Sequence, residues 1–293
     1  MSRSPMRLRV VHETRYDYEE GSEESHNELK LMPLTDEWQT CLQFKLTVTP
    51  ESRIHSFDQV GGRLHYYSIR PPHQLMIIRT EATVLTFPRE PWTDLSGEAV
   101  GLDGSSEKRH RREFAEYLNP TEKVPFAPEA LTFAAESIKR SGGRPLGFLL
   151  DLTRRIHKTI AYTPGATHID TPLTEVLAMG KGVCQDMTHL MLSILRQTGL
   201  PARYVSGYLY TGKDGGAGGH RMLGGDAMHA WVEALLPDGQ WYGFDPTNNR
   251  RTDEAYIRVH VGRDYTDVVP VKGVFRGPKA GKLSVDVAVA RIG

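Results

Sequence analysis

Residues 180–201 read GKGVCQDMTHLMLSILRQTGLP, and this stretch decides the fold of the C-terminal half of the chain. After the cysteine, apolar side chains recur at helical spacing, which predicts an amphipathic helix with one buried face. Gly199 and Pro201 mark its end. Cys184 falls in the first turn, beside unpaired backbone N–H groups and the positive end of the helix dipole, a location that favours thiolate over thiol. The two glycines before it allow a sharp backbone turn that leaves one side of the sulfur open.

Two strands predicted downstream of the helix carry a histidine and an aspartate. The first covers residues 227–236 and contains His229, and the second covers 240–245 and ends at Asp245. If the three residues between them form a hairpin loop with a left-handed glycine, Asp245 lies opposite Trp231 and diagonally next to His229. A two-residue loop would instead turn Asp245 to the other face. Trp231 is predicted on the same face of the strand as His229. It either lines a substrate cleft beside His229 or, as we favour, belongs to the hydrophobic core.

Cys184, His229 and Asp245 supply a nucleophile, a general base and an orienting carboxylate. Taken singly, each also has a structural interpretation. Cys184 could be a buried residue at a helix start, His229 a strand histidine with its hydrogen bonds satisfied, and Asp245 a turn cap. Their joint order and predicted adjacency favour thiol-dependent acyl transfer. Asp186 and Asp226 neighbour triad members along the chain and either brace them or cap a helix and a turn.

The composition excludes several classes of protein. Thirty-six basic residues face 36 acidic ones, so the chain lacks the excess positive charge of nucleic-acid binders. No apolar run approaches the about twenty residues needed to span a bilayer, and no hydrophobic signal segment opens the chain. We therefore expect a cytoplasmic protein with neither nucleic acid nor membrane as partner. Its two cysteines form no disulfide scaffold, and Cys41 is expected to be a small buried hydrophobe in a strand.

At 293 residues the chain fits two small domains or one large one. Residues 1–88 are β-rich: runs of β-branched and aromatic residues are separated by turn signals, which predicts a small β-sandwich. The turn signals are Pro50-Glu51-Ser52, Gly61-Gly62 and Pro71-Pro72. Residues 266–293 end in an alternating segment that we expect to return to this sandwich as a strand.

Between these β-rich ends the pattern becomes mainly helical. Residues 89–125 form a linker and the start of the helical region, and residues 126–265 form the core. Helices are predicted from Pro128 to the glycine pair at 142–143 and from Pro145 to about residue 160. Seven glycines between residues 211 and 225 predict an exposed, mobile loop.

The sequence resembles the transglutaminase-like superfamily, in which Cys, His and Asp follow in this order. The matching core segments are 182–186, 226–233 and 243–248, with 162–165 and 261–265 beside them. Segments 14–18 and 25–29 resemble the N-terminal region that accompanies this core in bacteria. The resemblance covers most of the chain except the linker, and the three core motifs are specific when found together.

This resemblance implies an α+β fold: a papain/transglutaminase-like core, with the helix bearing Cys184 packed on an antiparallel sheet bearing His229 and Asp245, preceded by the β-sandwich domain. Family members form a thioester with an amide carbonyl and pass the acyl group to water or to an amine. Bacterial relatives look more like hydrolases, so we expect a cysteine protease or amidase acting on a peptide or protein amide. We expect no metal and no cofactor, and the oligomeric state is left open. The Cys184 N–H is one expected oxyanion donor; the second is not identified.

Two competing interpretations remain at this point. A zinc site could use Cys184, His189, His220 and His229, but zinc ligands are usually paired closely in sequence, which disfavours it. The chain could also be a non-catalytic scaffold that binds peptides or partners. An intact Cys, His and Asp set counts against that scaffold.

Overall fold

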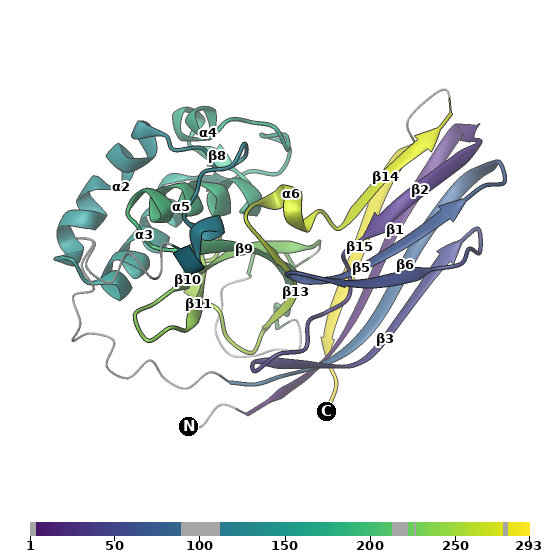
Figure 1. Ribbon diagram of the computed structural model, residues 1–293, viewed down its shortest axis with the longest axis horizontal. Helices are drawn as coiled ribbons and strands as arrows, with labels where there is room; N and C mark the ends of the chain where they lie inside the picture. Colours follow the sequence, from purple (N-terminus) through teal and green to yellow (C-terminus); the bar gives the residue numbers. More distant parts are fainter. Residues whose placement is uncertain (1–3, 89–111, 213–221, 226, 278–280) are drawn as a thin grey trace.

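The computed structural model describes residues 4–88, 112–212, 222–225, 227–277 and 281–293. A β-sandwich lies on one side, helices lie on the other, and the sheet that carries the site lies between them (Figure 1). No helix in these described ranges is long and apolar enough to cross a bilayer.

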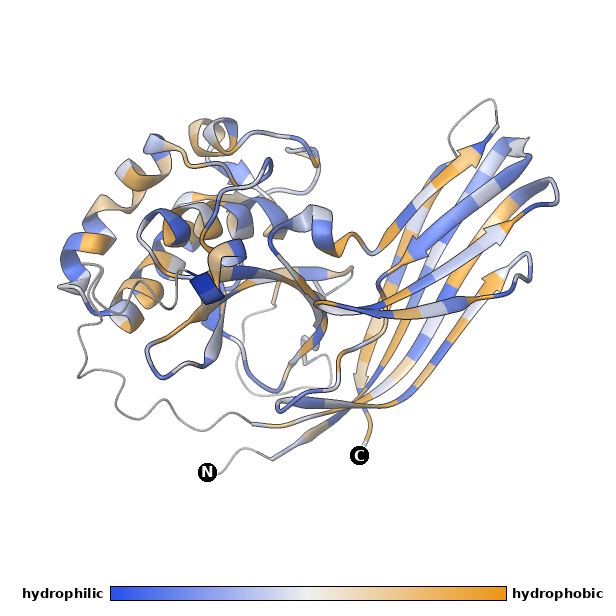
Figure 2. Cartoon of the chain, in the orientation of Figure 1, coloured by the Kyte–Doolittle hydropathy of each residue, from blue (hydrophilic) through white to orange (hydrophobic). Residues whose placement is uncertain are grey.

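The sandwich consists of two four-stranded antiparallel sheets. In spatial order the first holds β15 (Lys282–Arg291), β1 (Met6–Ser22), β6 (His73–Thr86) and β3 (Gln39–Thr49). The second holds β14 (Val271–Arg276), β2 (Glu24–Leu29), β5 (Gly62–Ile69) and β4 (His55–Gln59). Apolar and polar residues alternate along many of these strands (Figure 2). Strands from both ends of the chain thus complete the two sheets. The predicted turn signals lie at the junctions of β3, β4, β5 and β6, with Gly62 as the first residue of β5.

Cys41 lies in β3, as predicted, but the prediction that it is buried is wrong. The pairing with β6 shifts between Cys41 and Gln43, so a bulge interrupts the strand alternation there. The thiol is half-buried and donates to the Gln43 carbonyl oxygen at 3.4 Å. Partial burial raises the pKa of this thiol above its ordinary value.

The α+β core packs helices on one face of a five-stranded antiparallel sheet (Figure 1). The helices are α2 (Pro128–Ser141), α3 (Pro145–Thr159), α4 (Leu173–Met179) and α5 (Cys184–Gln197). The sheet order is β12 (Arg250–Arg251), β11 (Trp241–Asp245), β10 (His229–Leu235), β9 (Ala202–Leu209) and β13 (Tyr256–Gly262). Left-handed Gly142 ends α2 and left-handed Gly199 follows α5, so the predicted helix ends are confirmed.

The N-terminal region covers the outer edge of β13. The Leu34 N–H donates to the Arg258 carbonyl at 3.0 Å, and the Val261 N–H donates to the Gly61 carbonyl at 2.9 Å. The buried Gln39 side chain donates to the Arg258 carbonyl at 2.8 Å and accepts from the Arg258 N–H at 2.7 Å. An unpaired strand edge is a liability in water. These contacts therefore join the sandwich region to the site-bearing sheet through hydrogen bonds to the backbone of β13.

Candidate active site

Cys184 is the first residue of α5, as the apolar spacing predicts. The preceding Val183 is extended, with φ of −115°, and its N–H donates to Asp186 Oδ2 at 2.7 Å. The Thr167 hydroxyl donates to the same oxygen at 2.7 Å. Burial raises the pKa of Asp186, and these two donors oppose that rise. Asp186 therefore caps the helix that presents the thiol and does not contact the imidazole through any described hydrogen bond.

The two glycines before Cys184 have different structural roles. Gly180 adopts φ of +61° and ends α4, so it supplies the predicted turn. Gly182 pairs with Tyr162 in the short parallel ladder of β8 (Lys181–Gly182) with β7 (Ala161–Tyr162). A Cβ at Gly182 would lie 3.0 Å from both Cβ and Oδ2 of Asp186. Gly182 thus leaves room for the capping carboxylate, a role that the sequence did not reveal.

The β10–β11 hairpin has the predicted register. Gly239 is left-handed, with φ of +80°, and Val232 pairs with Phe244, as a three-residue loop requires. His229 and Asp245 consequently project from the same face of the sheet. His229 Nε2 lies 2.8 Å from Asp245 Oδ2, and both side chains are fully buried.

His229 and Asp245 stabilise each other's charged forms. Burial disfavours the imidazolium, but the Asp245 carboxylate and, after it, the nearby Cys184 raise the pKa of His229 to about 10. Burial likewise opposes ionisation of Asp245, yet His229 holds the pKa of this carboxyl below its ordinary value. His229 Nδ1 is buried and has no hydrogen-bond partner among the described residues. Because Nε2 is paired with Asp245, Nδ1 is the nitrogen left for the thiol.

Four further hydrogen bonds fix the Asp245 carboxylate. Oδ1 accepts from the backbone N–H groups of Thr247 at 2.8 Å and Asn248 at 3.1 Å. Oδ2 accepts from Asn248 Nδ2 at 2.7 Å and from the Tyr256 hydroxyl at 2.8 Å. Burial raises the pKa of Tyr256 well above its ordinary value, so the phenol remains a donor. Sequence reasoning missed Tyr256, because it lies on β13 with no motif spacing to link it to Asp245.

The other sequence candidates have different positions. Trp231 is fully buried, with its ring centroid 6.2 Å from that of His229 and 5.3 Å from that of Tyr256. Trp231 therefore belongs to the core behind the pair, which is the interpretation that we favoured. Asp226 lies outside the described residues, as does most of the glycine-rich loop, residues 213–221.

The described residues of the zinc hypothesis form no group of three or more that could hold a metal ion. His189 is buried in α5, and its Nε2 accepts from the Tyr265 N–H at 3.2 Å. Burial lowers the pKa of His189 to about 4, so its imidazole is neutral at physiological pH. His220 falls outside the described residues. Among those that are described, no group of three or more His, Cys, Asp or Glu side chains is arranged to hold a metal ion.

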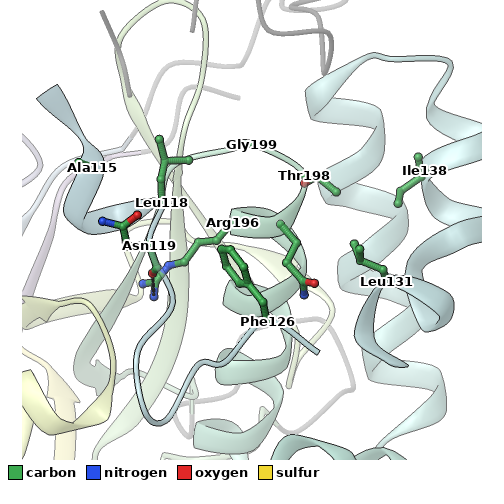
Figure 3. A pocket seen from close by; sticks show the side chains of 10 residues that line it. Ala115, Leu118, Asn119, Phe126, Leu131, Ile138, Arg196, Thr198 and Gly199 are labelled. Atoms are coloured by element: carbon green, nitrogen blue, oxygen red, sulfur yellow. Dashed lines mark hydrogen bonds between the residues drawn. The ribbon is translucent and has the colours of Figure 1, made fainter. Parts of the chain in front are cut away.

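A cavity of about 680 Å³ lies at the opposite end of α5 from Cys184 (Figure 3). Phe126, Leu131 and Ile138 supply apolar walls, and the buried Arg196 lies beside them. The Arg196 guanidinium donates to the carbonyls of Ala202 and other backbone groups. Because the cavity lies at the C-terminal end of α5 and Cys184 lies at its start, the cavity is separate from the thiol and the imidazole.

Comparisons with known proteins agree with this geometry. Residues 133–246 match the profile of the transglutaminase-like superfamily, and residues 8–85 match that of the bacterial transglutaminase-like N-terminal region. An uncharacterised protein of Mycobacterium leprae is 34% identical, over 98% of this chain and 99% of its own length. The protein-glutamine gamma-glutamyltransferase of Pseudomonas aeruginosa is 32% identical over 116 residues, which are 39% of this chain and 17% of that protein.

A solved structure extends the likeness to the fold. A proposed cysteine protease of Cytophaga hutchinsonii superposes with a TM-score of 0.72 at 20% identity, covering 100% of this chain and 92% of that one. The predicted α+β class, with its transglutaminase-like core, is confirmed. The chain belongs to the transglutaminase-like superfamily and carries the bacterial transglutaminase-like N-terminal region.

Proposed function

We propose that Cys184, His229 and Asp245 form a catalytic triad that hydrolyses amide bonds in peptide or protein substrates. One observation carries the proposal: a fully buried Asp245 holds His229 Nε2 at 2.8 Å, which leaves Nδ1 for a thiol at the first residue of a helix. A nucleophile, a base and an orienter in this arrangement are the elements of thiol catalysis.

In the proposed reaction, the Cys184 sulfur attacks the carbonyl carbon of the amide. The carbon–nitrogen bond then breaks, and His229 Nδ1 gives its proton to the leaving nitrogen, so a thioester and an amine remain. Water attacks the thioester while His229 takes up one of its protons. The carbon–sulfur bond breaks, releasing a carboxylic acid and restoring the thiolate and imidazolium.

The start of α5 also supports the charge that develops on the carbonyl oxygen. The first N–H groups of a helix have no partner within the helix and lie at its positive end. The Cys184 N–H belongs to this set, so it is the first oxyanion donor in our proposal. Asp186 keeps this helix start in place through its bond from the Val183 N–H.

Transfer to an amine is the second candidate, favoured by the similarity to a protein-glutamine gamma-glutamyltransferase. The two reactions share the thioester and differ only in the acceptor. Hydrolysis carried out in heavy-oxygen water places the label in the acid product. Transfer instead places an added primary amine in a new amide.

The proposed function is tested by trapping the acyl-enzyme. The protein is incubated with a peptide library, quenched in acid, and the mass attached to each cysteine is determined. We expect acyl adducts on Cys184 in the unmodified chain and in Cys41→Ser, and none in Cys184→Ser. Cys41 is the matched control, because it is the other cysteine of the chain. If no adduct forms and iodoacetamide alkylates Cys184 no faster than a free cysteine peptide, the chain is a non-catalytic scaffold.

A further inference from the structure

Asn248 joins the Asp245 carboxylate to a backbone segment that precedes β10. Its Nδ2 donates to Asp245 Oδ2 at 2.7 Å and to the Leu223 carbonyl at 3.1 Å. Its Oδ1 accepts from the Leu223 N–H at 2.7 Å. Both amide protons and the amide oxygen are therefore used, and an aspartate of the same shape could not replace them because it has no N–H groups.

The residue after Leu223 lies directly against the His229 ring. Gly224 is left-handed, with φ of +88°, and a Cβ there would lie 2.4 Å from His229 Nδ1 and 3.1 Å from Cε1. Only glycine suits both the backbone conformation and the distance. The edge of the imidazole that is left for the thiol is thus bounded by the Gly224 backbone.

We propose that Asn248 is a positioning residue that holds the Leu223–Gly224 backbone against His229 and so fixes the imidazole in its orientation toward Cys184. This proposal rests on the triad function and deepens it. We call the set Asn248, Leu223 and Gly224 the Asn248 bridge.

The bridge makes the ring position depend on two contacts at opposite edges. Asp245 holds Nε2 through a hydrogen bond, whereas Gly224 limits rotation at the Nδ1 edge by contact alone. Asn248 links the two because it bonds both Asp245 and Leu223. A loss of Asn248 should therefore release the ring at both edges, while a loss of another Asp245 donor should release it at one.

Tyr256 provides the comparison that separates a bridge from a simple donor. Its hydroxyl donates to the same Asp245 oxygen as Asn248 does, at 2.8 Å, and no described hydrogen bond joins it to Leu223. If Asn248 acted only as a donor to Asp245, Asn248→Ala and Tyr256→Phe would have similar effects. The bridge predicts a larger effect for Asn248→Ala.

The test uses Asn248→Ala, Gly224→Ala, Tyr256→Phe and their pairwise combinations. Gly212→Ala is the matched control for Gly224→Ala, because Gly212 is also left-handed, with φ of +71°, and has no atom within 4 Å of an added Cβ. The first readout is the rate of Cys184 alkylation by iodoacetamide. The second is the imidazole nitrogen NMR signal of His229, assigned by its loss in His229→Gln.

Asn248→Ala should slow alkylation by about 10- to 100-fold, the effect of losing bonds around a charged group. Gly224→Ala should slow it to a similar extent, because a Cβ 2.4 Å from Nδ1 must displace the ring. The double variant should be no slower than the slower single one, because both substitutions displace the same backbone segment relative to the Nδ1 edge of the ring. Tyr256→Phe should slow alkylation less than Asn248→Ala does, because it leaves the contacts with Leu223 in place. Both bridge variants should shift the His229 nitrogen signals, and Gly212→Ala should leave them unchanged.

Equal alkylation rates for Asn248→Ala and Tyr256→Phe, or effects of Asn248→Ala and Gly224→Ala that multiply, would overturn the bridge. If Asn248→Ala fails to fold by circular dichroism, the NMR signals alone test the bridge. It then requires that Gly224→Ala shift the His229 nitrogen signals and that Gly212→Ala leave them unchanged. Neither readout requires a substrate. Absence of amidase activity would therefore refute the proposed function and leave the test of the bridge intact.

Discussion

Replacing Asp245 with asparagine tests the electrostatics of the site most directly. The side chain keeps its size and can still face Tyr256 and Asn248, but it loses the charge that opposes the desolvation of His229. The carboxylate and the thiol together raise the pKa of His229 from its ordinary 6.5 to about 10, which corresponds to on the order of 5 kcal/mol in favour of the charged pair. Because burial remains and Cys184 alone is left to oppose it, the pKa of His229 in Asp245→Asn should fall well below its value in the unmodified chain.

A loss of the positive charge on His229 should lower the reactivity of Cys184. In the unmodified chain the imidazolium persists up to about pH 10, so a positive charge lies near the Cys184 sulfur throughout this range and should speed its alkylation. In Asp245→Asn a smaller fraction of the imidazole should be protonated at pH 7, and alkylation there should slow by at least about tenfold. Turnover of any amide substrate should fall by about 10³- to 10⁴-fold, the cost of a mispositioned base in a triad.

The same pair also predicts how stability depends on pH. A raised pKa of His229 stabilises the fold fully below pH 6.5, and this contribution is lost as the pH rises towards 10. A lowered pKa of Asp245 stabilises the fold above pH 3.8 and is lost as the pH falls through the native value. Asp245→Asn should thus cost most between pH 4 and 6.5, up to about 3–5 kcal/mol, and less at pH 10.

Alkylation profiles and urea unfolding at pH 6 and pH 10 check these expectations. Asp245→Asn must be folded at pH 6 for the alkylation comparison to count, and unfolding curves establish that. An unchanged alkylation profile in the folded variant, or a stability difference that grows between pH 6 and pH 10, would refute the reasoning.

Two further substitutions test the supports of the site. Gly182→Ala should displace the Asp186 carboxylate that caps α5, lowering stability by about 1–2 kcal/mol and slowing Cys184 alkylation. Gly147→Ala, at a helical glycine where an added Cβ would meet only Arg144 Cβ at 4.0 Å, should instead stabilise by about 0.5–1 kcal/mol. Equal thermal shifts for the two glycine variants would contradict this. Gln39→Ala should leave a buried N–H of β13 unpaired and cost about 1–3 kcal/mol in urea unfolding, whereas the exposed Gln43→Ala on the same strand should stay within about 0.5 kcal/mol. Similar losses from both glutamines would show that the contact at the edge of β13 contributes little.

The sequence alone determined the elements that carry the site. Apolar spacing placed Cys184 at the start of α5, and the three-residue loop 237–239 fixed the register of the β10–β11 hairpin that brings His229 beside Asp245. Both inferences depend on residues close together in the chain. Helical periodicity, capping and tight turns are local, so they can be read without knowing the rest of the fold.

Tertiary structure decided what surrounds these elements. Tyr256 reaches Asp245 from β13, and Asn248 reaches Leu223, contacts that no spacing along the chain encodes. Tertiary packing also left Cys41 half-buried at a bulge where alternation predicted a buried side chain. In each case the deciding contact joins segments whose approach depends on how sheets and helices pack. Tertiary structure also sets the charge of His229, because that charge depends on burial together with a carboxylate from the neighbouring strand.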